Sequence, residues 1–344
     1  MRYVKTINLK QGDVLARDIT DIKGNILLRA NNTVLSEFII SKLKERKIGG
    51  IYIIDELSKD LEIEDEIPSQ IKYMAVDALE KKEVQQTQEL SKKIVESFKT
   101  TEIDLNRMLG ETTYYERALN ICELCLNVGK RLNMNNNDLI KLSASALLSD
   151  IGLILNEKEK EQILDSELEN LKKLLLNLPI SETYPILSKY VVSKAYADPM
   201  IVHSVYYHSE NENGTGVVQD FYKKFGIDRN CDIRSTAKII HICSDYVDTL
   251  LRENDFIKAR NQIEKGIVDK LYNYEIAAIF LKFIPIYPIG TIVKLSNGEE
   301  AIVIKNNEGY PLTPVVKLKT GEIIDLTKVL NIVIDNNENI EKHL

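Results

Sequence analysis

The sequence has few of the residues that metal centres, disulfide frameworks and membrane spans require. Its 344 residues include only four histidines and four cysteines. Four cysteines are too few for a disulfide framework in a chain of this length, and they fit a reducing compartment. No run approaches the roughly 18 consecutive apolar residues of a spanning helix, and the start of the chain lacks the apolar core of a signal peptide. We therefore expect a cytoplasmic protein with no membrane insertion.

An excess of basic residues is also missing. The chain has 45 lysines plus arginines against 52 aspartates plus glutamates, which gives a formal net charge of -7. A protein that mainly coats nucleic acid or an anionic membrane needs a basic field, so we expect neither as a partner. With 44% apolar and 28% charged residues, the composition is that of a folded protein with at least one large core.

The hydrophobic pattern divides the chain into five segments. Residues 1–55 read as a small α/β module, with a helix over 36–46 and a strand over 51–54. Residues 56–101 are an acidic linker followed by a polar helix, either a linker helix or one that faces a partner. Helical periodicity over 102–284 predicts a bundle. Residues 285–335 predict a β extension of two hairpins, the first with a type I′ turn at Asn297-Gly298, and 336–344 form a tail. The predicted fold is therefore mainly α.

Two stretches within the predicted bundle look like parts of a phosphohydrolase site. One is Asp150-Ile151-Gly152 at the end of an apolar helix, and the other is His208-Ser209-Glu210 followed by Asn213-Gly214-Thr215-Gly216. Here the sequence resembles the HD-GYP family of cyclic di-GMP phosphodiesterases, whose patterns are H-D-I-G-K and H-H-E-x-x-D-G-x-G-Y-P. The resemblance runs from about residue 113 to 282, and the segments on both sides look like modules that commonly flank this domain. It implies an HD-like helical bundle.

The resemblance also implies a metal site, because family members hold two or three iron or manganese ions that activate a water. Of seven ligand positions, only Asp150 and His208 keep a family residue. The other five fall on Arg117 (or Tyr114 with a small slip), Ser149, Tyr184, Ser209 and Ser244. Two ligands cannot hold a binuclear cluster, since each ion needs most of its ~6 positions fixed. We therefore expect no cofactor, and iron or manganese only if other groups have replaced the lost ligands.

The glycine loop keeps part of the family pattern. Glu210, Gly214 and Gly216 match it, whereas Val217-Val218 replaces the Tyr-Pro pair. A basic cluster follows the loop and includes Arg234 and Lys238, which could attract a phosphate-bearing ligand. The candidate ligand loop is therefore Glu210, Asn213, Gly214, Gly216, Arg234 and Lys238. A plain turn followed by a solvated surface of mixed charge is the alternative.

The other residues able to do chemistry have simpler interpretations. His203 lies on a different helical face from His208 and is interpreted as packing. The stripe of His241, Asp245, Asp248 and Arg252 is interpreted as a solvated polar face. Cys122 and Cys125 lie on an apolar stripe and predict core packing rather than zinc or redox chemistry, and His343 lies in the tail.

Three hypotheses of function follow from these observations. The first is a degenerate HD-GYP protein without metal-dependent hydrolysis that acts as a receptor, sensor or scaffold in cyclic di-GMP-linked signalling. The second is a slow phosphodiesterase in which Asp150, His208, His203 and Glu210 hold one metal ion. The third is a protein-interaction platform whose working parts are the amino-terminal module and the acidic helix. The sequence leaves open cyclic di-GMP and another signalling protein as partners of this chain. It also leaves open that the chain forms a homodimer.

Overall fold

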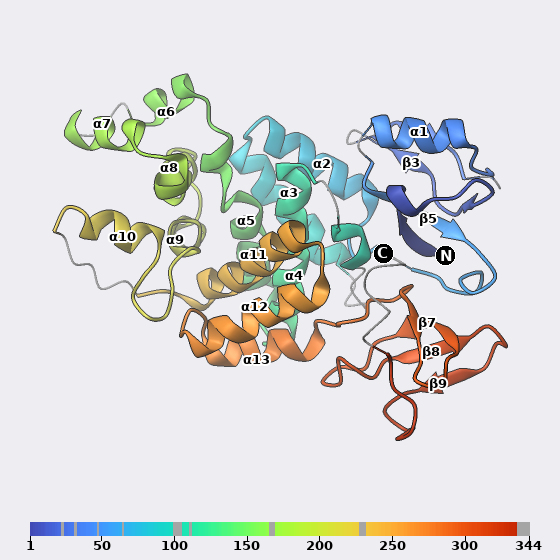
Figure 1. The fold of residues 1–344 in the computed structure, drawn as a ribbon. Coiled ribbons are helices and arrows are strands. Elements are labelled where there is room, and N and C mark those ends of the chain that lie inside the picture. The colour runs from blue at the N-terminus through green and yellow to red at the C-terminus, as the bar shows by residue number, and fades with distance from the viewer. Residues whose placement is uncertain are drawn as a thin grey trace.

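The computed structural model describes residues 1–21, 24–30, 33–46, 48–63, 65–98, 105–109, 112–164, 169–226 and 232–335. The chain is mainly helical, with small sheets near both ends, as the sequence predicts. A helical bundle occupies the centre, and the amino-terminal module and the carboxy-terminal sheet lie at one end of it (Figure 1). Within the described ranges, no helix is both long and apolar enough to cross a membrane.

The amino-terminal module contains the predicted helix and strand. Its antiparallel sheet has the order β1 (Arg2–Lys5), β5 (Gly50–Ile54), β2 (Val14–Leu15), beside a hairpin of β3 (Ile19–Thr20) and β4 (Ile26–Leu28). Helix α1 (Glu37–Glu45) begins after Ser36, whose hydroxyl accepts a hydrogen bond from the amide of Ile39. The short helix η1 (Thr6–Asn8) follows β1. Apolar side chains from the sheet and α1 form a core of their own.

The segment interpreted as a linker and helix is built into the bundle. It forms α2 (Ser69–Glu80) and α3 (Val84–Ser97). Val76, Leu79 and Ile94 on these helices belong to the main core. One face of each helix is therefore buried in the bundle, because a narrow apolar stripe within a polar sequence is enough to bury one face.

The centre of the bundle is formed by α4 (Tyr114–Arg131), α5 (Asn136–Leu148) and α11 (Ser235–Glu253). Thr113 and Glu116 form a capping box at the start of α4, and the Asn135 side chain caps α5. Cys122 and Cys125 are fully buried, which confirms core packing. The bundle also contains η2 (Leu105–Met108), η3 (Ile151–Ile154), α6 (Glu157–Ile163), α7 (Glu169–Asn177), α8 (Ile180–Lys194), α9 (Pro199–Tyr207), α10 (Val217–Lys223), α12 (Phe256–Val268) and α13 (Tyr274–Phe283).

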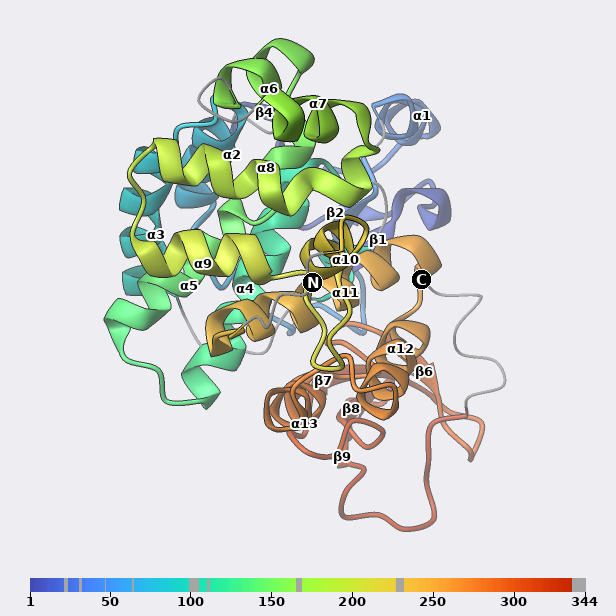
Figure 2. The ribbon, with the colours of Figure 1, turned by 90° about the vertical axis from the view of Figure 1, so that its left-hand side faces the viewer.

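Helices α8, α9 and α10 cover one side of this centre, and Figure 2 shows them facing the viewer in front of α4, α5 and α11. Residues of α8 pack against η3, which directly follows the end of α5. The arrangement brings the two motif stretches of the sequence together, because His208 is the C-cap of α9 and Asp150 is the N-cap of η3.

The carboxy-terminal extension is a four-stranded antiparallel sheet in the order β6 (Ile292–Lys294), β7 (Glu300–Lys305), β8 (Val315–Leu318), β9 (Ile323–Asp325). Both predicted hairpins are present, but the first turn is not type I′. Lys294 pairs with Glu300, so the connection is longer than two residues, and only Gly298 of the Asn-Gly pair has a positive φ, +88°. Type I′ needs two such residues. The predicted tail, with His343, lies outside the described residues.

Candidate functional site

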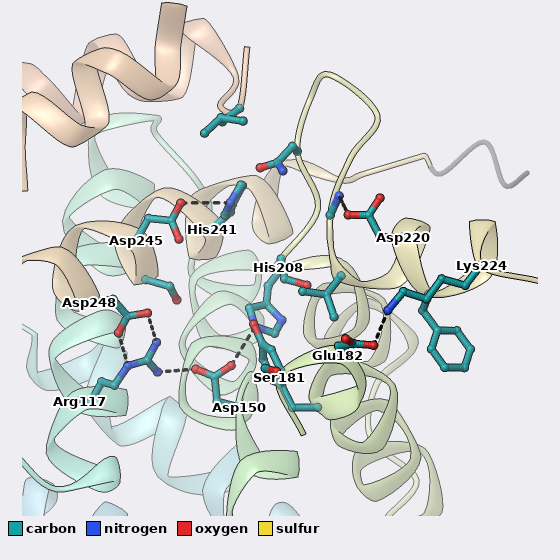
Figure 3. A pocket seen from close by; sticks show the side chains of 18 residues that line it. Arg117, Asp150, Ser181, Glu182, His208, Asp220, Lys224, His241, Asp245 and Asp248 are labelled. Carbon is teal, nitrogen blue, oxygen red and sulfur yellow. Dashed lines mark hydrogen bonds and ion pairs between the residues drawn. The ribbon is translucent and has the colours of Figure 1, made fainter. Parts of the chain in front are cut away.

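A cavity of about 590 Å³ lies between α4, α8, α10 and α11, at the place where the two motif stretches meet. Figure 3 shows the polar side chains that line it. The family ligand positions on its wall are Arg117, Asp150, Tyr184, His208, Ser209 and Ser244. Ser149 is the exception, because it is buried behind the wall and its hydroxyl donates to the carbonyl of Ala146 at 3.0 Å. Tyr114, the alternative to Arg117, is also absent from the wall.

Arg117 of α4 reaches two carboxylates at once. Its Nη1 donates to Asp150 Oδ2, while Nε and Nη2 donate to Oδ1 and Oδ2 of Asp248 at 2.5 and 2.7 Å (Figure 3). Burial lowers the pKa of Arg117, but the two carboxylates more than offset this and hold the pKa above its ordinary value. The charged guanidinium therefore joins α4 to the end of α5 and to α11.

His208 binds the other oxygen of Asp150. Its Nδ1 lies 2.8 Å from the carbonyl oxygen of Val205, so this nitrogen donates, and its Nε2 lies 2.9 Å from Asp150 Oδ1. Both residues are buried, with Asp150 only 3% exposed. Burial raises the pKa of Asp150, but the charge of Arg117 and the His208 hydrogen bond outweigh burial and hold the pKa well below its ordinary value. Asp150 is thus a carboxylate with both oxygens occupied.

The remaining ligand positions present neutral groups to the cavity. The buried hydroxyls of Ser209 and Ser244 have no hydrogen-bond partner among the described residues. The ring of Tyr184 stands edge-on to the His208 imidazole, with 5.7 Å between ring centres. Burial raises the pKa of Tyr184 far above its ordinary value, so the phenol is uncharged.

Three residues of the α11 stripe that is interpreted as solvated, His241, Asp245 and Asp248, line the cavity. His241 is only 7% exposed, and its Nε2 lies 3.3 Å from Asp245 Oδ2. The Tyr272 hydroxyl donates to the same carboxylate at 2.7 Å. Burial raises the pKa of Asp245, but the His241 contact outweighs it and leaves the pKa below its usual value. Of the stripe, only His241 is buried, whereas the side chains of Asp245, Asp248 and Arg252 are 38%, 44% and 62% exposed.

The candidate ligand loop is divided by the structure, because only Gly216 lines the cavity. The Glu210 carboxylate accepts from the backbone amides of Val218 at 2.7 Å and Gln219 at 3.0 Å, so it caps α10. The other candidates bond elsewhere or carry no cavity contact: Asn213 donates to the Asp269 carbonyl, Lys223 donates to the Gly214 carbonyl, Lys238 pairs with Glu212 at 2.8 Å, and Arg234 is the N-cap of α11.

These residues do not fit a binuclear iron or manganese centre. Asp150 and His208 bond to each other, and the guanidinium of Arg117 stands on the second oxygen of Asp150. A divalent cation there would meet the fixed positive charge of Arg117. In the part of the chain that the structure describes, no three histidine, cysteine, aspartate or glutamate side chains gather as a metal site. His203 is not among the residues that line the cavity, and its Nε2 lies 2.9 Å from the Asp232 carbonyl oxygen.

The cavity thus brings together Asp150, the N-cap of η3, and His208, the C-cap of α9, the two residues that carry the resemblance in the sequence. No family model matches the chain. The chain is 26% identical over 241 residues to the cyclic di-GMP phosphodiesterase PdeB of Borreliella burgdorferi, a match that covers 66% of this chain and 59% of that relative. The chain thus matches less than two thirds of the relative's length. This similarity supports the HD-GYP assignment that the motifs indicate.

Two solved structures are similar to this chain at low TM-score. The HDG"Y"P protein Bd1817 from Bdellovibrio bacteriovorus has 15% identity and a TM-score of 0.45, covering 81% of this chain and 97% of that chain. The HD domain of the L. monocytogenes phosphodiesterase PgpH, in complex with cyclic di-AMP, has 13% identity and a TM-score of 0.33, covering 49% of this chain and 87% of that chain.

Proposed function

We propose that this chain is a degenerate HD-GYP protein that lacks metal-dependent hydrolysis and acts as a signalling receptor, sensor or scaffold. One observation carries the proposal: both oxygens of Asp150, the one carboxylate kept from the family ligand set, are bonded to Arg117 and His208. Metal-assisted phosphodiester hydrolysis needs ions that activate the water and hold the reacting oxygens. The serines that replace the other ligands supply neutral hydroxyls, which are poor substitutes for imidazole and carboxylate.

Within this proposal, the charges of the cavity favour a scaffold over a receptor for cyclic di-GMP. Two basic side chains, Arg117 and Lys224, line the wall, and Lys224 pairs with Glu182 while Arg117 pairs with two aspartates. The wall also carries five carboxylates, on Asp150, Glu182, Asp220, Asp245 and Asp248. The phosphates of a cyclic dinucleotide would therefore have to displace a carboxylate from one of the two cations. The volume of the cavity itself suits a small-molecule ligand.

Metal analysis and hydrolysis measured on one preparation test the proposal. We expect well below one iron or manganese ion per chain by elemental analysis. Incubation with cyclic di-GMP and Mn²⁺ is expected to give no more product than the Asp150→Asn variant gives. A metal pair near stoichiometry, with hydrolysis that disappears in His208→Ala, would select the phosphodiesterase hypothesis instead. Calorimetric titration with cyclic di-GMP separates the remaining roles, because saturable binding selects a receptor and its absence selects a scaffold.

A further inference from the structure

The side chain of Arg117 lies where α4, the end of α5 and α11 meet. The guanidinium is contacted from two directions, by Asp150 at the end of α5 and by Asp248 on α11. The side chain of Asp150 is 4% exposed and that of Arg117 is 18% exposed, whereas that of Asp248 is 44% exposed. One buried carboxylate and one half-exposed carboxylate therefore share a single cation.

A buried carboxylate has to be neutralised, since an unpaired ion in a protein interior is strongly destabilising. In a metal-dependent bundle, the metal ions neutralise such a carboxylate. Here Arg117 neutralises Asp150 through Nη1, and the paired hydrogen bonds from Nε and Nη2 to Asp248 fix the plane of the guanidinium. A lysine at the same position would offer one compact charge and could not bridge both carboxylates in this way.

We infer that Arg117 is a built-in cation that performs the structural part of the missing metal ions, holding α4, the end of α5 and α11 together around Asp150. The inference rests on the proposed function. Under this inference, the charge of the cavity comes from its own side chains and does not depend on bound metal ions. The inference also assigns Arg117 and Asp248 a positioning role that follows from their contacts and not from a family ligand set.

Removal and chemical rescue of the guanidinium test this inference. In Arg117→Ala, Asp150 keeps His208 but loses the guanidinium on its other oxygen, and we expect the melting temperature to fall by roughly 5–10 °C. Because Arg117 lines the cavity, a small molecule can enter the space that it leaves. We expect millimolar ethylguanidinium to restore part of the loss, ethylammonium to restore less, and Mn²⁺ to restore none. The matched control is Arg131→Ala on the same helix, whose arginine pairs with Glu308 away from the cavity and whose melting temperature ethylguanidinium should leave unchanged.

A double variant keeps the test decisive if Arg117→Ala does not fold. Arg117→Ala with Asp150→Asn removes the buried charge together with its partner, so it should be more stable than Arg117→Ala alone and gain less from ethylguanidinium, which then meets only Asp248. An Arg117→Ala protein as stable as the parent, or one rescued by Mn²⁺ as well as by ethylguanidinium, would overturn the inference. Failure of the proposed function looks different, because it appears as bound metal and hydrolysis in the unaltered protein.

Discussion

Glu210 occupies a position of the family motif, yet its carboxylate is turned into the protein. It accepts from two consecutive amides at the start of α10, where the helix leaves them without internal partners. Gly216 allows this approach, since a Cβ at that position would lie 2.7 Å from the Cα of Glu210 and the residue has a φ of +137°. The sequence keeps the motif residue for local structure, at the edge of the cavity.

Loss of this cap is therefore expected to cost stability. Glu210→Ala should lower the free energy of unfolding in urea by about 0.5–2 kcal/mol, because the two amides at the start of α10 lose their acceptor. Glu210→Gln keeps one acceptor oxygen, so its free energy of unfolding should lie between those of the parent and Glu210→Ala. Glu212→Ala, which removes an exposed ion pair with Lys238 two residues along, is the control and should change stability by less than about 1 kcal/mol. An unchanged unfolding curve for Glu210→Ala would show that the cap contributes nothing.

At the scale of single residues, the sequence identified which positions had changed but not what the changed residues do. Asp150 and His208 stand out because a motif surrounds each of them. Asp248 carries no such signal, since its contact with Arg117 joins residues 131 apart in the chain. The period of the α11 stripe was correct, but that His241 alone of its residues is buried depends on the packing of other elements against α11. Local spacing does not contain that information.

Between elements, Gly152 sets how closely α8 approaches η3. A Cβ there would lie 2.4 Å from the Tyr184 carbonyl oxygen and 2.9 Å from the Ser188 amide nitrogen, both of which are backbone atoms. The Gly152 amide also donates to the Ser188 hydroxyl at 2.8 Å. The glycine of the Asp-Ile-Gly stretch thus lets α8 carry Tyr184 to the wall of the cavity.

A single methyl group at this contact should separate the two elements. Gly152→Ala is expected to lower the free energy of unfolding by about 1–3 kcal/mol, because backbone cannot move aside as a flexible side chain can. Ser188→Ala removes only the hydrogen bond and should cost about 1 kcal/mol, so it measures that part of the effect separately. Equal losses for the two variants in urea unfolding would mean that the close approach itself costs nothing.

The elements that the sequence predicted well are those with strong local signals. The hairpins of the carboxy-terminal sheet and the helix over 36–46 follow from alternation, turn residues and a capping serine. The burial of α2 and α3 was not predicted, because these helices are rich in charged residues and only their contacts in the main core show which face is apolar. Charge content alone does not separate a partner-facing helix from one that is packed on one side.

Across the whole molecule, the three parts meet through charged contacts. Lys317 of the carboxy-terminal sheet pairs with Asp60 at 2.6 Å, and Arg17 of the amino-terminal module pairs with Asp65 at 3.1 Å. Next to Asp65, Lys72 of α2 lies 3.1 Å from Glu123 of α4, whose side chain is fully buried. This junction therefore takes several charges out of water between the amino-terminal module and the bundle.

Burial at this junction, together with the nearby charge of Arg107, lowers the pKa of Lys72 to about 7, although Asp65 and Glu66 oppose the change. In the unfolded chain the pKa returns to about 10.4. Between these values the unfolded state binds more protons, so the free energy of unfolding should rise with pH, by up to about 1.4 kcal/mol per pH unit from this group. The contribution of Lys72 to the free energy of unfolding is therefore highest above the unfolded pKa. It decreases as the pH falls from about 10.4 and is fully lost once the pH has fallen through the folded pKa of about 7.

Urea unfolding from pH 7.5 to 9.5 measures that slope. Lys72→Met should flatten it relative to the parent, because the titrating group is gone, whatever the variant does to stability at one pH. Lys81→Met is the control from the C-cap of the same helix, since its ammonium pairs with Asp77 and the resulting pKa is raised, not lowered. If both variants keep the slope of the parent, Lys72 remains protonated in the folded protein throughout this range, and the junction holds the lysine as a permanent ion pair with Glu123.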